Sequence, residues 1–301
     1  MPVHVCQLCP RRCNVSRSET LEAAVFPGFC TSPLEPVVAR AALHHWEEPV
    51  ISGERGSGAV FFCGCNLHCV FCQNSDISSR PVGKAVTVTR LREIYFKLIS
   101  DGAHNINLVT PMHFTDAVLQ SLEEPLPVPV VWNSNGYELP ECIRKLKGKI
   151  QIFLPDLKYA DNRLAARYSH APDYFETACK AVMEMYSQTG NYVIDDDGLL
   201  RSGIVIRHLI LPGCVENSKK VIDFVAQTFR PGEVLFSLMR QYLPCGKVSE
   251  NDYPELNRRV SDEEYSEVEQ YLFDSGLEDG FVQDADSASQ DFIPHFDGTG
   301  V

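Results

Sequence analysis

From about residue 57 onward, short runs of apolar residues alternate with stretches that have helical periodicity. The apolar runs are almost continuous and end in polar, Gly or Pro residues, which is typical of buried parallel strands. They cover residues 59–65, 105–111, 128–136, 149–158, 203–212 and 234–244. Between them, residues 89–100 and 217–229 carry apolar stripes of helical spacing, with Thr89 the expected N-cap of the first helix. A third helix is predicted after Ser261, which forms a capping box with Glu264.

This alternation predicts an α/β fold with a parallel sheet and right-handed crossovers. The strands are fewer than a closed barrel contains, so we expect an open, partial (β/α)6 barrel over residues 56–282. Such folds carry their chemistry at the C-terminal ends of the strands. That rule selects a set of residues for the functional site: Cys65, Thr110, Asn133, Asn135, Asp156, Lys158 and Tyr242.

The two ends of the chain differ from this middle part. Residues 1–55 contain four cysteines and several prolines but little periodicity, so we expect a cysteine-rich N-terminal module that no apolar core organises. Residues 283–301 are acidic and rich in small residues before an aromatic patch, Phe292 to Phe296. This C-terminal tail is expected either to be disordered or to fold back over the strand ends.

Composition and charge narrow the class of protein. The chain has 301 residues, of which 44% are hydrophobic, and a formal charge of −13 from 40 acidic and 27 basic residues. This balance argues against a general affinity for nucleic acid or for an anionic membrane. The chain has no signal-peptide core and no apolar run of about 18 residues, so we expect a cytoplasmic protein without membrane association. Its twelve cysteines are then metal-binding or catalytic candidates rather than disulfides.

The strongest motif is Cys65-x3-Cys69-x2-Cys72, directly after the first predicted strand. Three closely spaced thiolates can bind three corners of a [4Fe–4S] cluster and leave one iron open to a small molecule. A structural zinc site needs a fourth ligand, for which His68 would have to share the tight turn of the loop.

This spacing, with Phe71 before the third cysteine, resembles the signature of the radical S-adenosylmethionine superfamily. The run LHHWEEPVISGERGSGAVFFCGCNLHCVFCQNSDIS at 43–78 is more narrowly similar to an uncharacterised branch of pyruvate formate-lyase-activating-enzyme homologues, as are the opening CQLCPRRC and the closing FDGTGV. The resemblance implies a radical enzyme of this fold with a [4Fe–4S] cluster and S-adenosylmethionine. Such enzymes form a 5′-deoxyadenosyl radical that abstracts hydrogen from a substrate, and they need a reductant such as flavodoxin or ferredoxin.

The resemblance also implies roles for the strand ends. Asn133 and Asn135 resemble the polar residues that hold the cofactor ribose, and Asp156 with Lys158 resembles the pair that contacts the methionine moiety. Side chains two residues apart on a strand share one face, so this charged pair is expected to point into the barrel. The alternative is an ion pair exposed to solvent at a strand end.

Other positions match less closely. Where relatives have a Gly-Gly-Glu-like turn for the methionine amino group, this chain has Thr110 followed by Pro111. A Thr hydroxyl or a carbonyl is left as the expected acceptor. Phe71 is expected beside the cofactor, whereas Tyr242 either closes over it or is a core aromatic.

The remaining cysteines fall into two groups. Cys6, Cys9, Cys13 and Cys30 have the spacing C-x2-C-x3-C-x16-C, which suits a closed zinc site or an auxiliary iron–sulfur cluster. The sequence slightly favours the cluster, which would serve as an electron relay or in substrate docking; free thiols are the alternative. The other group is expected to pack as small hydrophobes, except that Cys245 is a candidate for the active site: Cys63, Cys142, Cys179, Cys214 and Cys245.

These features support three hypotheses. The first is an activating enzyme that installs a glycyl radical on a partner enzyme. The second is a radical enzyme that modifies a peptide, a nucleic acid or a small metabolite, with nucleic acid disfavoured by charge. The third is a non-enzymatic iron–sulfur or zinc protein.

Overall fold

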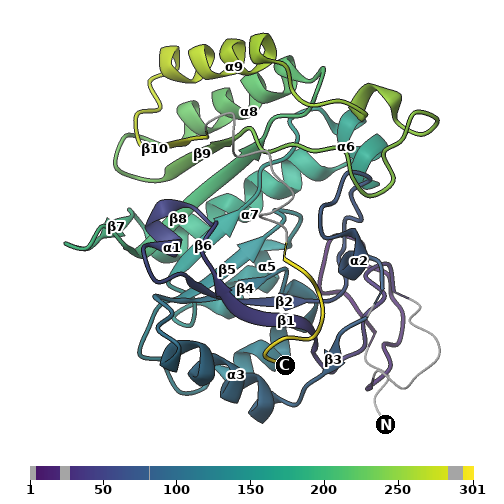
Figure 1. The fold of residues 1–301 in the computed structure, drawn as a ribbon, viewed down its shortest axis with the longest axis vertical. Helices are drawn as coiled ribbons and strands as arrows, with labels where there is room; N and C mark the ends of the chain where they lie inside the picture. Colours follow the sequence, from purple (N-terminus) through teal and green to yellow (C-terminus); the bar gives the residue numbers. More distant parts are fainter. Residues whose placement is uncertain (1–4, 21–27, 81, 284–293) are drawn as a thin grey trace.

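The computed structural model describes residues 5–20, 28–80, 82–283 and 294–301, and it has the predicted α/β architecture (Figure 1). One mostly parallel sheet has the strand order β10–β9–β8–β6–β5–β4–β2–β1–β3, and β7 pairs with β8 outside this path. The six predicted runs form its parallel centre: β2 (Ser57–Phe62), β4 (Ile106–Val109), β5 (Val130–Ser134), β6 (Ile152–Pro155), β8 (Leu200–Leu209) and β9 (Leu235–Met239).

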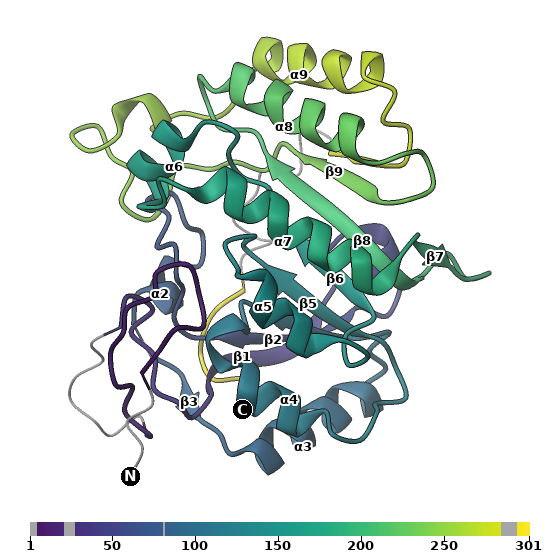
Figure 2. The ribbon, with the colours of Figure 1, turned by 180° about the vertical axis from the view of Figure 1, so that it is seen from behind.

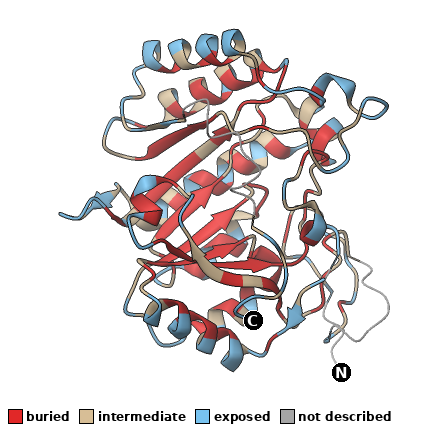
Figure 3. Ribbon diagram, viewed as in Figure 1, coloured by how far each residue is buried: buried red, intermediate tan, exposed pale blue. Residues whose placement is uncertain are grey.

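Five of these six central strands are buried along their whole length, and β8 is buried in its middle. Every residue of β4, β5 and β6 is buried, which explains why their sequences read as continuous apolar runs instead of alternating ones (Figure 3). All six strands stop two to five residues before the apolar runs end. The final residues of each run therefore lie in the loops at the carboxyl edge, where the polar side chains of the site are found.

Helices cover the outer side of the sheet, as the view from behind shows (Figure 2). They are α3 (Val88–Ser100), α4 (Thr115–Ser121), α5 (Pro140–Ile143), α6 (Asn162–Ser169), α7 (Tyr174–Thr189), α8 (Val215–Thr228) and α9 (Asp262–Asp274), with 3-10 turns η1 (Met112–Phe114), η2 (Arg144–Leu146) and η3 (Pro254–Leu256). The capping box of Ser261 and Glu264 is present. The expectation for Thr89 was wrong: Thr87 caps α3 by accepting from the Arg90 N–H, and Thr89 lies inside the first turn.

Several short elements were not predicted. β1 (Val37–His44) pairs antiparallel with β2 and β3 (Lys84–Ala85), and α1 (Pro49–Ser52) follows it. α2 (Ser75–Ser78), β7 (Val193–Ile194) and β10 (Gly280–Val282) complete the set. Because β1 belongs to the main sheet, the last third of the expected N-terminal module packs with the barrel, and the described residues before Val37 lie outside the sheet.

The described end of the chain, residues 294–301, runs back along β1 (Figure 1). The Gly298 N–H donates to the Ala39 carbonyl at 3.0 Å, and the Ala41 N–H donates to the Thr299 carbonyl at 2.9 Å. Phe292, part of the aromatic patch, lies outside the described residues. Among the helices that the structure describes, none is long and apolar enough to cross a membrane.

Candidate functional site: a cysteine loop facing a polar strand edge

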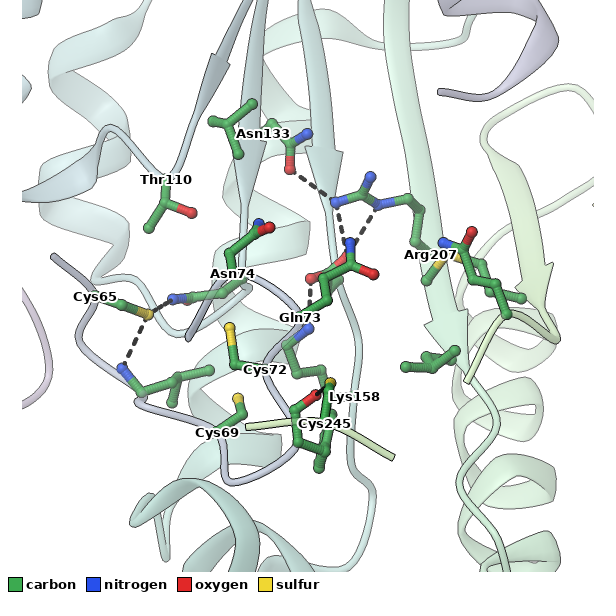
Figure 4. Close-up of a pocket in the computed structure, with 18 of the residues that line it drawn as sticks. Cys65, Cys69, Cys72, Gln73, Asn74, Thr110, Asn133, Lys158, Arg207 and Cys245 are labelled. Atoms are coloured by element: carbon green, nitrogen blue, oxygen red, sulfur yellow. Dashed lines mark hydrogen bonds and ion pairs between the residues drawn. The ribbon is translucent and has the colours of Figure 1, made fainter. Parts of the chain in front are cut away.

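The loop 63–74 follows β2 and carries Cys65, Cys69 and Cys72 (Figure 4). Backbone hydrogen bonds tie it to three distant parts of the chain. The Gly64 N–H donates to Ile77, the Val70 N–H donates to Tyr168, and the Lys247 N–H donates to Val70, at 2.7 to 2.8 Å. Since these bonds involve only the backbone, they fix the path of the loop independently of charge.

The three sulfur atoms gather in one region of a pocket (Figure 4). The Sγ of Cys65 accepts from the Leu67 N–H at 3.3 Å and from the Asn135 amide at 3.4 Å, and the Sγ of Cys69 accepts from the Ser169 hydroxyl at 3.0 Å. Hydrogen bonds to sulfur are a known means of tuning an iron–sulfur cluster. Burial raises the pKa of Cys69 to about 11 and that of Cys72 still further. Buried thiolates here would need cationic iron beside them, so this donor set fits a [4Fe–4S] cluster.

The opposite wall of the pocket is charged and largely withdrawn from solvent. Asp156 at the end of β6 pairs with Lys158 at 2.5 Å and with Arg207 at 2.9 Å, and Arg207 also pairs with Glu47 at 3.0 Å. The four side chains are only 10 to 17% exposed, so Asp156 and Lys158 are not a solvent-exposed pair. The pKa of Asp156 is lowered overall, because Arg207 and Lys158 outweigh the effect of burial, which raises it. The pKa of Lys158 is raised overall, because Asp156 outweighs the effect of burial, which lowers it.

The two asparagines at the end of β5 have different partners. The Asn133 amide oxygen accepts from Arg207 at 2.7 Å, and its nitrogen donates to Glu47 at 3.3 Å, which joins it to the charged wall. The Asn135 amide nitrogen donates to the Asn66 side chain at 2.7 Å as well as to the Cys65 sulfur. Asn135 therefore links the cysteine loop to the strand edge.

Thr110, at the end of β4, has a positive φ of 57°. A β-branched residue is strained in this left-handed conformation, and such strain is often found at functional sites. The turn thus has a shape that glycine would adopt freely, although the sequence has Thr followed by Pro.

Aromatic residues and a further thiol close the pocket near the loop. Phe71 and Tyr242 pack edge to face with ring centroids 5.9 Å apart, and the Tyr242 hydroxyl donates to the Leu256 carbonyl at 2.8 Å. Tyr242 therefore lines the pocket and is also a core aromatic. The Cys245 thiol lines the pocket too and donates to the Phe71 carbonyl at 3.0 Å.

The structure thus brings eleven residues selected from the sequence into one pocket: Cys65, Cys69, Phe71, Cys72, Thr110, Asn133, Asn135, Asp156, Lys158, Tyr242 and Cys245. It also adds lining residues that the sequence analysis missed: Glu47, Gln73, Asn74, Arg207, Gln241 and Pro294. The sequence did contain a signal for Arg207, because a charged residue inside a predicted buried strand suggests a functional role. The sequence contained no such signal for Glu47, since β1 was not predicted and nothing indicated that the loop after β1 returns to the site.

The four N-terminal cysteines do not line this pocket. Cys9 and Cys30 are buried, whereas Cys6 and Cys13 are half-buried. Across the part of the chain that the structure describes, no three His, Cys, Asp or Glu side chains converge closely enough to hold a single metal ion. Of the scattered cysteines, Cys179 is half-buried and three are buried: Cys63, Cys142 and Cys214.

Comparison with known proteins agrees with this fold and site. Residues 51–169 match the model of a 4Fe-4S single cluster domain, which includes the whole cysteine loop. An uncharacterized protein of Methanocaldococcus jannaschii is 32% identical over 277 residues, which cover 89% of this chain and 73% of the relative. The 7-carboxy-7-deazaguanine synthase of Methanothermobacter thermautotrophicus is 29% identical over 105 residues, or 34% of this chain and 42% of that enzyme. A mutant of spore photoproduct lyase has a similar fold, with a TM-score of 0.50, 12% identity and 81% of each chain covered.

The chain therefore belongs to the radical S-adenosylmethionine superfamily, as its cysteine loop indicated. The cofactors of this superfamily are a [4Fe–4S] cluster and S-adenosylmethionine.

Proposed function

We propose that the protein is a radical S-adenosylmethionine enzyme of the activating-enzyme type, which abstracts hydrogen from a polypeptide and leaves a glycyl radical on it. The observation that carries the proposal is the pocket itself: three cysteines on one side face a buried set of charged and amide groups on the other. In this proposal Cys65, Cys69 and Cys72 hold the cluster. When bound, the cluster supplies the electron that cleaves S-adenosylmethionine into methionine and a 5′-deoxyadenosyl radical.

The charged wall suits the amino-acid end of S-adenosylmethionine, which carries one carboxylate and one ammonium group. Lys158 can turn from Asp156 to that carboxylate, because Arg207 keeps the Asp156 charge paired from the other side. Asp156 is then available to accept from the ammonium group. Arg207 is a positioning residue in this scheme, since its other contacts, to Glu47 and Asn133, hold it in place.

The remaining side chains orient the nucleoside end and exclude water. Asn133 and Asn135 present amide groups at the end of β5, where ribose hydroxyls would find both a donor and an acceptor. Phe71 and Tyr242 provide an apolar surface beside the loop, which protects a reactive radical from water.

An exposed aromatic residue at the edge of the pocket favours a polypeptide substrate. Trp46 lines the pocket although it is 61% exposed, so an aromatic surface reaches solvent there. Tyr and Trp are enriched at surfaces that bind other proteins. We also propose a cytoplasmic location, where the thiols stay reduced and a flavodoxin or ferredoxin is available as electron donor.

Anaerobically reconstituted protein, reduced with dithionite and mixed with S-adenosylmethionine, is expected to release 5′-deoxyadenosine. Cys69→Ala should reduce this product below detection, whereas Cys179→Ala, on α7 and outside the pocket, should keep it near the wild-type level. No 5′-deoxyadenosine from iron-loaded wild-type protein would favour the non-enzymatic hypothesis instead.

The polypeptide substrate is tested separately. With a candidate glycyl-radical enzyme present, electron paramagnetic resonance should show the doublet of a glycyl radical that depends on S-adenosylmethionine. A modified small molecule without a protein radical would support the alternative that the substrate is a metabolite. The partial likeness to 7-carboxy-7-deazaguanine synthase, whose name denotes a small-molecule product, is what keeps this alternative in view.

A further inference from the structure

We propose that Cys6, Cys9, Cys13 and Cys30 bind a second iron–sulfur cluster, which is seated directly against the cysteine loop of the barrel. This site lies outside the pocket, and neither the family match at 51–169 nor the proposed function includes it. Figures 1 and 2 both place the N-terminal segment beside α2, the helix that follows the cysteine loop.

The backbone folds these four cysteines into one compact group. The Cys6 N–H donates to the Val15 carbonyl at 2.8 Å, and the Asn14 N–H donates back to Cys6 at 3.1 Å, so the first three cysteines lie on a closed turn. The fourth comes from residues 28–30, where the Phe29 N–H donates to the Cys13 sulfur at 3.4 Å. Cys9 and Cys30 are buried, and Cys6 and Cys13 are half-buried, so the group is largely withdrawn from solvent.

A buried cation beside this group indicates that an anion belongs there. Arg17 is 6% exposed, and its guanidinium donates to three backbone carbonyls, those of Ser32, Pro33 and His113. In the described part of the chain, no carboxylate forms an ion pair with it. A buried charge without a counter-charge is costly. Iron–sulfur clusters with four thiolate ligands carry net negative charge, and they would supply the missing counter-charge next to Cys30.

The same module contacts the barrel loop at several points. A Cβ on Gly64, the residue before Cys65, would lie 2.6 Å from the Cys30 carbonyl, so the two backbones touch. Phe29 stacks on the His68 ring with centroids 4.7 Å apart, and Arg11 donates to the Asn66 carbonyl at 2.8 Å. A cluster held by the N-terminal cysteines would therefore be a close neighbour of one held by Cys65, Cys69 and Cys72.

The chemistry favours a cluster over zinc. A structural zinc ion needs its ligands about 2.3 Å from a single point, which would require the sulfurs to move closer together. In a [4Fe–4S] cluster, each cysteine binds a different iron, so the sulfurs stand further apart. The three loop cysteines, whose superfamily binds a cluster, likewise form no group in the described residues that could hold a single metal ion.

Metal analysis of anaerobically purified full-length protein tests this site without any activity measurement. We expect about eight iron and about eight sulfide per chain in the wild type, and about four of each in Cys9→Ala/Cys13→Ala. The control Cys142→Ala/Cys179→Ala removes two thiols outside both groups and should keep about eight iron. About four iron with one zinc in the wild type, or an iron content that the Cys9→Ala/Cys13→Ala change leaves unaltered, would overturn the proposal.

A second variant keeps the test decisive if the N-terminal change prevents folding. Cys65→Ala/Cys69→Ala/Cys72→Ala should retain about four iron and the absorption of a single cluster, and complete loss of iron would refute the second site. This variant cannot cleave S-adenosylmethionine, so its iron content is independent of the proposed function. In reduced wild-type protein, electron paramagnetic resonance should show broadening from two interacting clusters, and both cluster-deleted variants should lack this broadening.

Discussion

The two groups of cysteines are held in different ways. The loop with Cys65, Cys69 and Cys72 follows directly after a buried parallel strand, and backbone hydrogen bonds with three other segments fix its path. Cys6, Cys9, Cys13 and Cys30 belong to turns that contribute no strand to the sheet. Their module is attached to the barrel through a junction that includes Gly64, Arg11 and Phe29 at the loop and Arg17 at the His113 carbonyl. The first group takes its position from the sheet, whereas the second depends on this junction.

The junction shows how a module without a large core can still be placed accurately. Packing of one glycine against a backbone, one stacked ring pair and one arginine with carbonyl partners set its position on the loop. Small changes at the junction should therefore disturb the N-terminal group more than the barrel group. Three predictions test this difference, in order of expected size.

Gly64→Ala should have the largest effect on stability. Its Cβ would lie 2.1 Å from the Ser32 Oγ and 2.6 Å from the Cys30 carbonyl, at a φ of +89°. We expect a loss of about 4 kcal/mol in the free energy of unfolding, measured by anaerobic denaturation, together with loss of iron from the N-terminal site.

Gly148→Ala is the matched control for this change. Gly148 has a φ of +77°, but a Cβ there meets nothing within 4 Å, so only the backbone cost of about 1 kcal/mol is expected. Equal losses in the two variants would show that the contact at Gly64 does not hold the module.

The barrel side should respond to pH through a buried carboxyl. Glu138 is 2% exposed and accepts from the Trp132 indole at 3.0 Å, and burial raises its pKa from 4.5 to about 7. The folded state then binds more protons than the unfolded state between these values, so the stability from Glu138 is present below about pH 4.5 and is lost as pH rises through about 7. Among the described residues before Val37, no carboxylate is buried, so this pH response should belong to the barrel part of the chain, where burial also raises the pKa of Glu48 to about 7 and adds in the same direction.

Glu138→Gln isolates that contribution. The free energy of unfolding of the variant minus that of the wild type should rise by about 3 kcal/mol from pH 4.5 to pH 8. The reason is that a pKa shift from 4.5 to about 7 corresponds to roughly that energy. Denaturation curves at both pH values provide the measurement. A difference between variant and wild type that is constant with pH would contradict the assignment.

Arg11→Met should have the smallest of the three effects. Arg11 donates to the Asn66 and Ser169 carbonyls at 2.8 and 2.9 Å and stacks over Phe29 at 4.0 Å, and methionine keeps only part of the apolar contact. We expect a loss of about 2 kcal/mol in thermal or chemical denaturation. The adjacent Arg12 forms an exposed ion pair with Glu141, so Arg12→Met should cost less than about 0.5 kcal/mol. If both variants lost the same amount, Arg11 would not be a connection between module and loop.

The sequence predicted the central strands well because continuous apolar runs of this kind have few alternatives. It also selected eleven residues that the structure gathers in one pocket, because the carboxyl ends of parallel strands meet at one edge. It failed for β1, a strand with a mixed pattern, and therefore missed Glu47. It misplaced the cap of α3, because Thr87 and Thr89 are both plausible N-caps and only the hydrogen bond to Arg90 distinguishes them.

By itself, the sequence determined the fold class and the superfamily, and it predicted the three loop cysteines as cluster ligands, because each rests on local spacing or on apolar runs. Only the tertiary structure decided that Arg207 and Glu47 complete the charged wall, since they are 160 residues apart in the chain and come together only in the folded pocket. It also decided that residues 294–301 run back along β1 and that the N-terminal cysteines lie against Gly64. Such contacts depend on how distant segments pack, and no local pattern in the chain encodes them.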